Sequence, residues 1–164
     1  MIYRMATLDD LNNVWDKDIS KNPHDERWKR WKTEYINYNN SGAAKTFVAL
    51  DNDEVIAQIT VVLKTNVKAV TGKDKLCDGR SIANMNAFRC DKEYEGQGHI
   101  SRLVKLGEEY ARSIGYTYVT IGSEAKESRN LAIYLHFGYR EFLMYELDNS
   151  EEECLLVLYY GKKL

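Results

Sequence analysis

Proline, cysteine and histidine are scarce in this sequence of 164 residues, and each shortage excludes a class of protein. The single proline, Pro23, rules out a proline-rich linker between domains. The three cysteines are odd in number and widely spaced, which predicts neither a disulfide framework nor a zinc site and is typical of a reducing compartment. The three histidines have no partners at metal-ligand spacing, so no metal is predicted.

Long apolar runs and a strong net charge are absent as well. The longest apolar stretches, such as Ile59–Leu63 and Leu155–Tyr160, fall far short of the ~20 residues that a membrane-spanning helix needs. A net charge of −2 implies no general affinity for nucleic acid or for an anionic membrane. No secretion signal follows Met1, so we expect a cytoplasmic protein. The length favours one domain, residues 1–164.

Hydrophobic periodicity predicts an alternation of strands and helices. A short strand at Ile2–Met5 precedes two helices, and the second helix carries four aromatic residues at helical spacing, Trp28, Trp31, Tyr35 and Tyr38. Three strands, a helix, a strand, a short helix and two final strands follow. This order predicts a mixed α/β (α+β) fold whose sheet contains a helix-crossed parallel pair.

Two glycines one residue apart, Gly96 and Gly98, stand at the start of the predicted central helix. A helix begins with N–H groups that lack partners, and a glycine turn before it lets a phosphate approach them. The ordinary explanation is that the glycines only shape a strand-to-helix turn. Spacing alone does not decide between the two.

Two familiar phosphate motifs fit this stretch poorly. A P-loop requires lysine followed by serine or threonine after its last glycine, but His99 and Ile100 follow Gly98. The dinucleotide fingerprint has Ser101 in place of its third glycine. Five residues, Asp91–Glu95, also separate the predicted strand from the first glycine, whereas the fingerprint follows its strand at once.

The stretches "AFRCDKEYEGQGHISRLV" and "NLAIYLHFGYREF" together resemble two motifs of the GNAT superfamily of acyl-CoA-dependent N-acetyltransferases. Tyr94, Gly96 and Gly98 match a glycine cradle that opens a helix. Tyr134 and Gly138-Tyr139 match a second motif about forty residues downstream. The resemblance covers essentially the whole chain and implies a mixed, mostly antiparallel seven-stranded sheet, flanked by about four helices, with a splayed central parallel pair.

The resemblance also implies acetyl-CoA as the co-substrate. The backbone of Phe88, Arg89 and Cys90 would bind its pantetheine arm and polarise the thioester, and Tyr134 would protonate the departing thiolate. The pyrophosphate would be held by the amides of Gly96, Gln97, Gly98, His99, Ile100 and Ser101.

The chain departs from the family pattern at several positions. Glu95 replaces the preferred arginine or glutamine, Ile100 the last glycine or alanine, and Lys92 the usual proline. Glu127 stands at the family's asparagine position, and Asn130, three residues later, would substitute for it only with a rearranged loop. The side chain of His99 either touches a phosphate or is exposed and contributes only its amide.

The general base and the acceptor site are less well marked. Glu124, at the end of the predicted fifth strand, is the best base candidate, although a solvated glutamate is the ordinary explanation. Asp78 is an alternative. The acceptor would contact Trp28, Trp31 and Asn84, although the aromatic residues also suit a helix that packs on the sheet.

The sequence thus predicts an N-acetyltransferase that moves an acetyl group from acetyl-CoA to a primary amine by direct attack in a ternary complex. A covalent cysteine route is disfavoured, because no cysteine has an evident histidine partner. The acceptor would be a small molecule or a peptide. A non-catalytic acyl-CoA-binding or sensing module is the alternative. The last strand, Leu155–Tyr160, is expected at a sheet edge, where it would pair two subunits as a homodimer.

Overall fold

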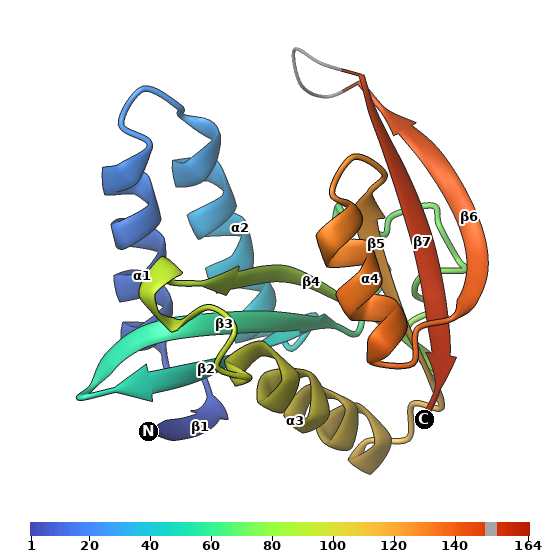
Figure 1. Cartoon of the computed structure of the whole chain (residues 1–164), viewed down its shortest axis with the longest axis horizontal. Helices are drawn as coiled ribbons and strands as arrows, with labels where there is room; N and C mark the ends of the chain where they lie inside the picture. The colour runs from blue at the N-terminus through green and yellow to red at the C-terminus, as the bar shows by residue number, and fades with distance from the viewer. Residues whose placement is uncertain (150–153) are drawn as a thin grey trace.

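The computed structural model describes residues 1–149 and 154–164, and its centre is one seven-stranded sheet (Figure 1). The strand order is β1-β2-β3-β4-β5-β7-β6, and every neighbouring pair is antiparallel except the parallel pair β4–β5. The strands are β1 (Ile2–Met5), β2 (Ala44–Asp51), β3 (Glu54–Val62), β4 (Ile82–Cys90), β5 (Tyr118–Glu124), β6 (Glu141–Asp148) and β7 (Leu155–Lys163). The predicted mixed sheet with a parallel pair is confirmed.

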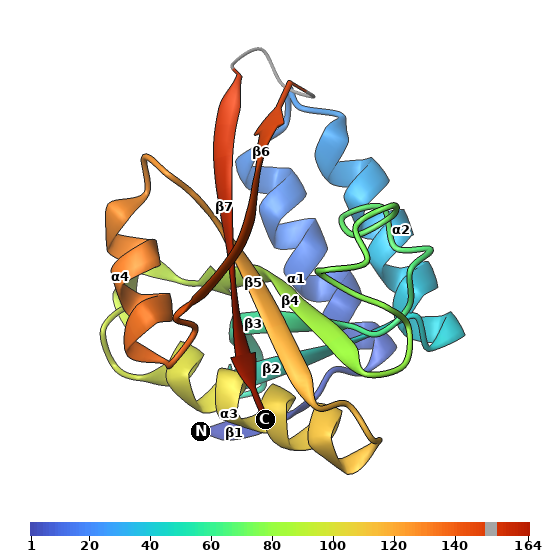
Figure 2. The ribbon, with the colours of Figure 1, turned by 90° about the vertical axis from the view of Figure 1, so that its right-hand side faces the viewer.

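Four α-helices cover the two faces of the sheet, and Figure 2 shows α1 and α2 on one side and α4 on the other. They are α1 (Leu8–Lys21), α2 (Arg27–Ser41), α3 (His99–Ser113) and α4 (Ser128–His136), with a short 3-10 turn, η1 (Lys92–Tyr94), after β4. None of the described helices combines the length and apolar composition needed to cross a bilayer.

The central strands are apolar on both faces because helices cover both. In β2, Phe47 and Ala49 belong to the cluster that packs under α3, whereas Val48 and Leu50 belong to the cluster under α1 and α2. All four side chains are at most 3% exposed. Alternate residues of a strand point to opposite faces, so a nearly continuous apolar run is what a two-sided core requires.

The position of the last strand differs from the prediction. β7 pairs with β5 on one side and with β6 on the other, so the edges of the sheet are β1 and β6. The expectation that Leu155–Tyr160 forms an edge is wrong. An apolar run indicates that both faces of a strand are covered, but it carries no information on which strands flank it.

A buried carboxylate fixes the end of α4 against the sheet. Glu108 of α3 is 7% exposed and accepts hydrogen bonds from Tyr139 at 2.8 Å and from Lys162 of β7 at 2.9 and 3.0 Å. Lys162 also donates to the carbonyl oxygen of Phe137 at 3.1 Å. These bonds connect three parts of the chain: α3, β7 and the segment that follows α4. They therefore hold α4 in a fixed orientation over strands β4 and β5.

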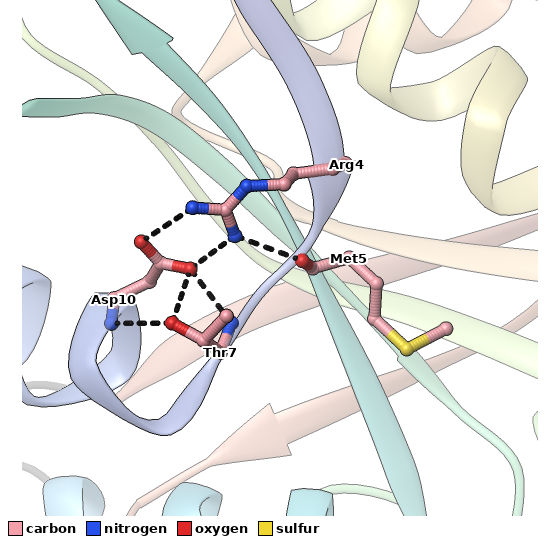
Figure 3. Close-up of polar contacts among 4 residues, drawn as sticks. All are labelled: Arg4, Met5, Thr7 and Asp10. Carbon is pink, nitrogen blue, oxygen red and sulfur yellow. Dashed lines mark hydrogen bonds and ion pairs between the residues drawn. The ribbon is translucent and has the colours of Figure 1, made fainter. Parts of the chain in front are cut away.

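The first helix begins with a reciprocal capping arrangement (Figure 3). The Thr7 hydroxyl accepts from the Asp10 N–H at 3.2 Å, and Asp10 accepts from the Thr7 N–H at 2.6 Å. Arg4 of β1 donates to both carboxylate oxygens of Asp10. Burial alone would raise the pKa of Asp10, but the hydrogen bonds from Arg4 and Thr7 lower it below its usual range.

Replacing Asp10 with asparagine is expected to lower the free energy of unfolding by about 1–2 kcal/mol at pH 7, because the carboxylate that accepts charged hydrogen bonds from Arg4 is lost. A carboxylate whose pKa is lower in the folded protein than in the unfolded chain contributes its full stabilisation to the fold above its unfolded pKa of ~3.9. This contribution is lost progressively as pH falls through the pKa of the folded state. Urea unfolding at pH 7 and pH 3 should therefore show the difference shrinking in acid. Asp9→Asn, at an exposed position of the same turn, is the control, and equal losses for the two variants would refute this account of the cap.

Candidate functional site

The parallel strands β4 and β5 separate halfway along their length. Ile82–Met85 pair with Tyr118–Ile121, and beyond Met85 no described residue of β5 pairs with β4. Figure 1 shows the two strands diverging from there. The second half of β4 therefore has an open backbone edge in the middle of the sheet, where a polar ligand can pair with it.

A bulge shapes this open half of β4. The β3–β4 register shifts between Gln58 and Thr60, and Ala87 has a φ of 52°, which is unusual for a residue other than glycine. After the bulge, the N–H of Asp91 donates to the carbonyl of Ile56 in β3 at 2.8 Å. Strand alternation then turns the N–H groups of Cys90 and Phe88 away from β3, toward the gap left by β5.

The two glycines adopt a backbone conformation that other residues rarely take. Gly96 has a φ of 75° and Gly98, the N-cap of α3, a φ of 84°, and no atom beyond the adjacent residues lies within 4 Å of the position a Cβ would occupy at either glycine. Both glycines therefore serve the left-handed turn rather than close packing inside the protein. The space beside them is open.

The N–H groups of residues 96–101 donate to no acceptor in the described parts of the chain. They follow one another through the left-handed turn and the first turn of α3, and no side chain caps the helix. Consecutive free N–H groups together with the positive end of a helix dipole form an anion-binding site.

Tyr134 of α4 faces the same region. Its side chain is 9% exposed, and its ring centroid lies 5.3 Å from that of Phe88 in the open half of β4. Its hydroxyl forms no hydrogen bond with residues 1–149 or 154–164. Burial raises the pKa of Tyr134 to about 12, so the hydroxyl keeps its proton at neutral pH and can donate it.

These parts line one groove of about 960 Å³, which extends from the start of α3, past the end of β4, to α1 and α2. The groove brings together most of the site residues predicted from the sequence. They are Trp28, Phe88, Arg89, Cys90, Gly96, Gly98, His99, Ile100, Ser101, Asn130 and Tyr134.

Four predicted residues do not line the groove. Glu124 lies 3.7 Å from Lys126 in an ion pair, and Asn84 is buried and donates to Thr120 Oγ1 at 2.9 Å. Trp31 packs edge-on against Trp28, with the ring centroids 5.2 Å apart. The side chain of Gln97 turns back to the carbonyl of Glu93 at 2.9 Å, which leaves only its backbone N–H to the cradle.

Asp78, the alternative base, is also outside the groove and is fully occupied. It accepts hydrogen bonds from the N–H groups of Arg80, Ser81 and Ile82 and from the Ser81 hydroxyl. Burial alone would raise the pKa of Asp78, but these bonds hold it far below the usual range. A carboxylate held in this way is a poor proton acceptor.

The sequence left two possibilities for the side chain of His99, contact with a phosphate or exposure to solvent. The side chain is only 6% exposed, so the second possibility is wrong. Its Nδ1 lies 2.7 Å from the hydroxyl oxygen of Tyr3, and the two rings stack with their centroids 6.0 Å apart. Tyr3 lies in β1, far away in the sequence, so only the sheet order brings the two together.

Sequence reasoning missed Asp18, which lines the groove and pairs with Arg89 at 2.6 Å. Arg89 lies over the rings of Trp15 and Trp28. Trp15 and Asp18 are three residues apart on α1, so helical spacing would have placed them on one face. No pattern in the sequence shows that this face meets Arg89 of β4.

A family model described as the acetyltransferase (GNAT) family matches residues 8–139. Among solved structures, the ribosomal-protein-alanine N-acetyltransferase from Brucella melitensis is similar at 17% identity and a TM-score of 0.72, with 100% of each chain covered. An N-acetyltransferase from Staphylococcus aureus Mu50 is similar at 16% identity and a TM-score of 0.71, with 99% of this chain and 97% of that chain covered.

An aminoglycoside 6'-N-acetyltransferase, whose structure contains coenzyme A, is similar at 12% identity and a TM-score of 0.71, with 99% of this chain and 97% of that chain covered. These similarities show the fold. No curated protein matches the sequence. Because the family model covers most of the length, the chain belongs to the acetyltransferase (GNAT) family.

Proposed function

We propose that this protein transfers the acetyl group of acetyl-CoA to a primary amine, by direct attack in a ternary complex, as a single domain of residues 1–164. One observation carries the proposal. The stretch of free N–H groups at residues 96–101, all but Gln97 in the lining of one groove, meets there the open edge of β4 and the unbonded hydroxyl of Tyr134.

The groove suits each part of coenzyme A. The N–H groups of residues 96–101 would hold the pyrophosphate, because charge-assisted hydrogen bonds to main chain need no lysine. The N–H groups of Phe88 and Cys90, which strand alternation turns away from β3, would receive the pantetheine arm and the thioester oxygen. Asn130 lines the groove on α4 and would contact the arm, although it lies three residues after the family's asparagine position.

Acetyl-CoA supplies an acetyl group activated as a thioester. The protein holds the amine against it, so that a C–N bond forms as the C–S bond breaks, and the amine gives up one proton. The N–H groups on the open edge of β4 stabilise negative charge on the thioester oxygen. Tyr134 donates its proton to the departing sulfur, which therefore leaves as a thiol, and the proton released by the amine returns through solvent to the Tyr134 oxygen, so that the hydroxyl is restored.

Direct attack is favoured over a covalent cysteine route. Cys90 lines the groove, but burial, together with Glu95, Asp91 and Glu93, raises the pKa of its thiol. A thiol with a raised pKa supplies little of the nucleophilic thiolate at neutral pH. No histidine ring is hydrogen-bonded to it within the described residues.

A non-catalytic acyl-CoA-binding module is the second candidate, favoured by Glu124 lying outside the groove. Two measurements separate the candidates: thermal stabilisation by acetyl-CoA, and thiol release with a panel of primary amines. We expect stabilisation and release with at least one amine. If acetyl-CoA stabilised the protein but no amine caused thiol release, the binding module would be the remaining candidate. If acetyl-CoA did not stabilise the protein, both candidates would be refuted.

The same proposal covers the partners and the compartment. The proposed acceptor is a small molecule or a peptide. The protein is further proposed to form a homodimer and to be located in the cytoplasm. Three free cysteines, Cys77, Cys90 and Cys154, suit a reducing compartment.

A further inference from the structure

The α1–α2 side of the groove contains a buried ion pair to which the proposed chemistry assigns no role. Arg89 lies between Phe88 and Cys90 in β4, and alternation turns its side chain to the face opposite theirs, toward α1 and α2. There its guanidinium carbon lies 3.9 Å from the ring centroid of Trp15 and 5.1 Å from that of Trp28. The guanidinium is thus fixed by the two indoles on the acceptor side of the strand.

The Arg89–Asp18 ion pair leaves hydrogen-bond donors of the guanidinium and an acceptor of the carboxylate without a partner among the described residues. Arg89 Nη1 and Asp18 Oδ2 are 2.6 Å apart and are both completely buried. The other guanidinium nitrogens and Asp18 Oδ1 are not among the completely buried polar atoms, and they form no hydrogen bond with any described residue. A guanidinium has five N–H groups, so most of its donors are available to a ligand in the groove.

The burial of this ion pair indicates that a charged ligand binds to it. Burial lowers the pKa of Arg89 and raises that of Asp18, despite the attraction between them. Each charge therefore remains poorly solvated and poorly compensated. A ligand with one positive and one negative group would supply what each member of the pair lacks.

The other charged groups on this side already have partners. Lys17 donates to Glu54 at 2.9 Å and pairs with Asp91, and Lys21 lies 3.6 Å from the same Asp91. Arg89 and Asp18 differ from these lysines because the contact between them is completely buried while other polar atoms of the same two side chains form no hydrogen bond with any described residue.

We propose that Arg89 and Asp18 recognise an acceptor that carries both an amine and a carboxylate, which is the amino acid class; this inference rests on the proposed function. The carboxylate binds the unused edge of the Arg89 guanidinium, where two parallel N–H groups fit its geometry. The amine lies toward Asp18 Oδ1, and the carbon skeleton packs on Trp28, which lines the groove. Because Phe88 and Cys90 flank Arg89, an acceptor held there lies next to the thioester.

The test compares each of the common L-amino acids with its own carboxamide, in which the amine is kept and the carboxylate is lost. Thiol release should favour the acids by on the order of 10²-fold in kcat/KM, the effect of a charged hydrogen bond at a desolvated site. The carboxamides have amines of lower pKa, because the neighbouring carboxylate is gone, so a larger fraction of each amine is unprotonated at neutral pH and protonation alone would favour the amides. Calorimetric titration of acids and amides into the coenzyme A complex measures the same preference without turnover.

The double variant Asp18→Asn/Arg89→Gln removes both charges together, which avoids leaving one of them unpaired. It should keep its thermal stabilisation by coenzyme A and lose the preference for acids to within about 3-fold, since the charged hydrogen bond is gone. Lys32→Gln, which breaks an ion pair with Asp16 outside the groove, should keep the preference.

The two proposals fail in different ways. Release with diamines or amides equal to or better than with acids would overturn the amino acid inference and leave acetyl transfer standing. Absence of release from every amine would overturn acetyl transfer, while the titration would still decide whether acids bind better than amides. Equal binding of acids and amides, or an unchanged preference in the double variant, would also overturn the inference.

Discussion

Tyr134→Phe is expected to lower kcat by ~10²–10⁴-fold, the usual contribution of a positioned general acid. Its affinity for coenzyme A should stay close to that of the wild type, because the ring and its contact with Phe88 remain. The expectation follows from a buried hydroxyl that forms no hydrogen bond with the described residues and faces the groove. Steady-state thiol release and calorimetry with coenzyme A separate the two effects.

The matched control is Tyr110→Phe, which removes a hydroxyl from α3 outside the groove. It should leave kcat unchanged. Because burial raises the pKa of Tyr134 to about 12, the wild-type rate should show no alkaline loss from this group until pH approaches that value. A Tyr134→Phe variant with wild-type kcat would remove the tyrosine from the mechanism.

Gly98→Ala is expected to weaken the binding of coenzyme A by ~10–100-fold, because it disturbs charge-assisted hydrogen bonds of the cradle. The φ of 84° disfavours any side chain, and the added methyl group would enter the open space beside residues 96–101. Strain in the backbone should also lower the free energy of unfolding by about 1–2 kcal/mol.

Gly115→Ala separates strain from binding. Gly115 has a φ of 96° just after α3, and nothing lies within 4 Å of its Cβ position either. This variant should lose similar stability in urea unfolding and keep its affinity for coenzyme A in calorimetry. If both variants lost affinity equally, the effect would be general destabilisation, and the cradle would not be its cause.

The glycine cradle could be predicted because its cause is local. Left-handed backbone favours glycine wherever it occurs, so Gly96 and Gly98 mark the turn in the sequence itself. The bulge in β4 could not be predicted in the same way. The residue with left-handed backbone in this bulge is Ala87, and an alanine in the sequence does not indicate such a conformation. The shift in register is set by the pairing of β4 with β3.

The remaining differences arise from contacts between segments distant in the sequence. His99 is buried because Tyr3 of β1 covers it, and Asp18 reaches the groove because α1 packs on β3, the strand next to β4. Helical and strand periodicity predicts which residues share a face, but not which element that face meets. Glu124 illustrates the same limit, since its position at the end of β5 was correct while its side chain pairs with Lys126 outside the groove.

The central claim is that free main-chain N–H groups at the start of α3 hold the pyrophosphate of coenzyme A. Backbone amide resonances of ¹⁵N-labelled protein, followed during titration with coenzyme A and separately with pantetheine, test it most directly. The amides of residues 96–101 should shift strongly with coenzyme A and little with pantetheine, which lacks the pyrophosphate. If coenzyme A bound while these amides stayed unchanged, or if pantetheine shifted them equally, the claim would be contradicted.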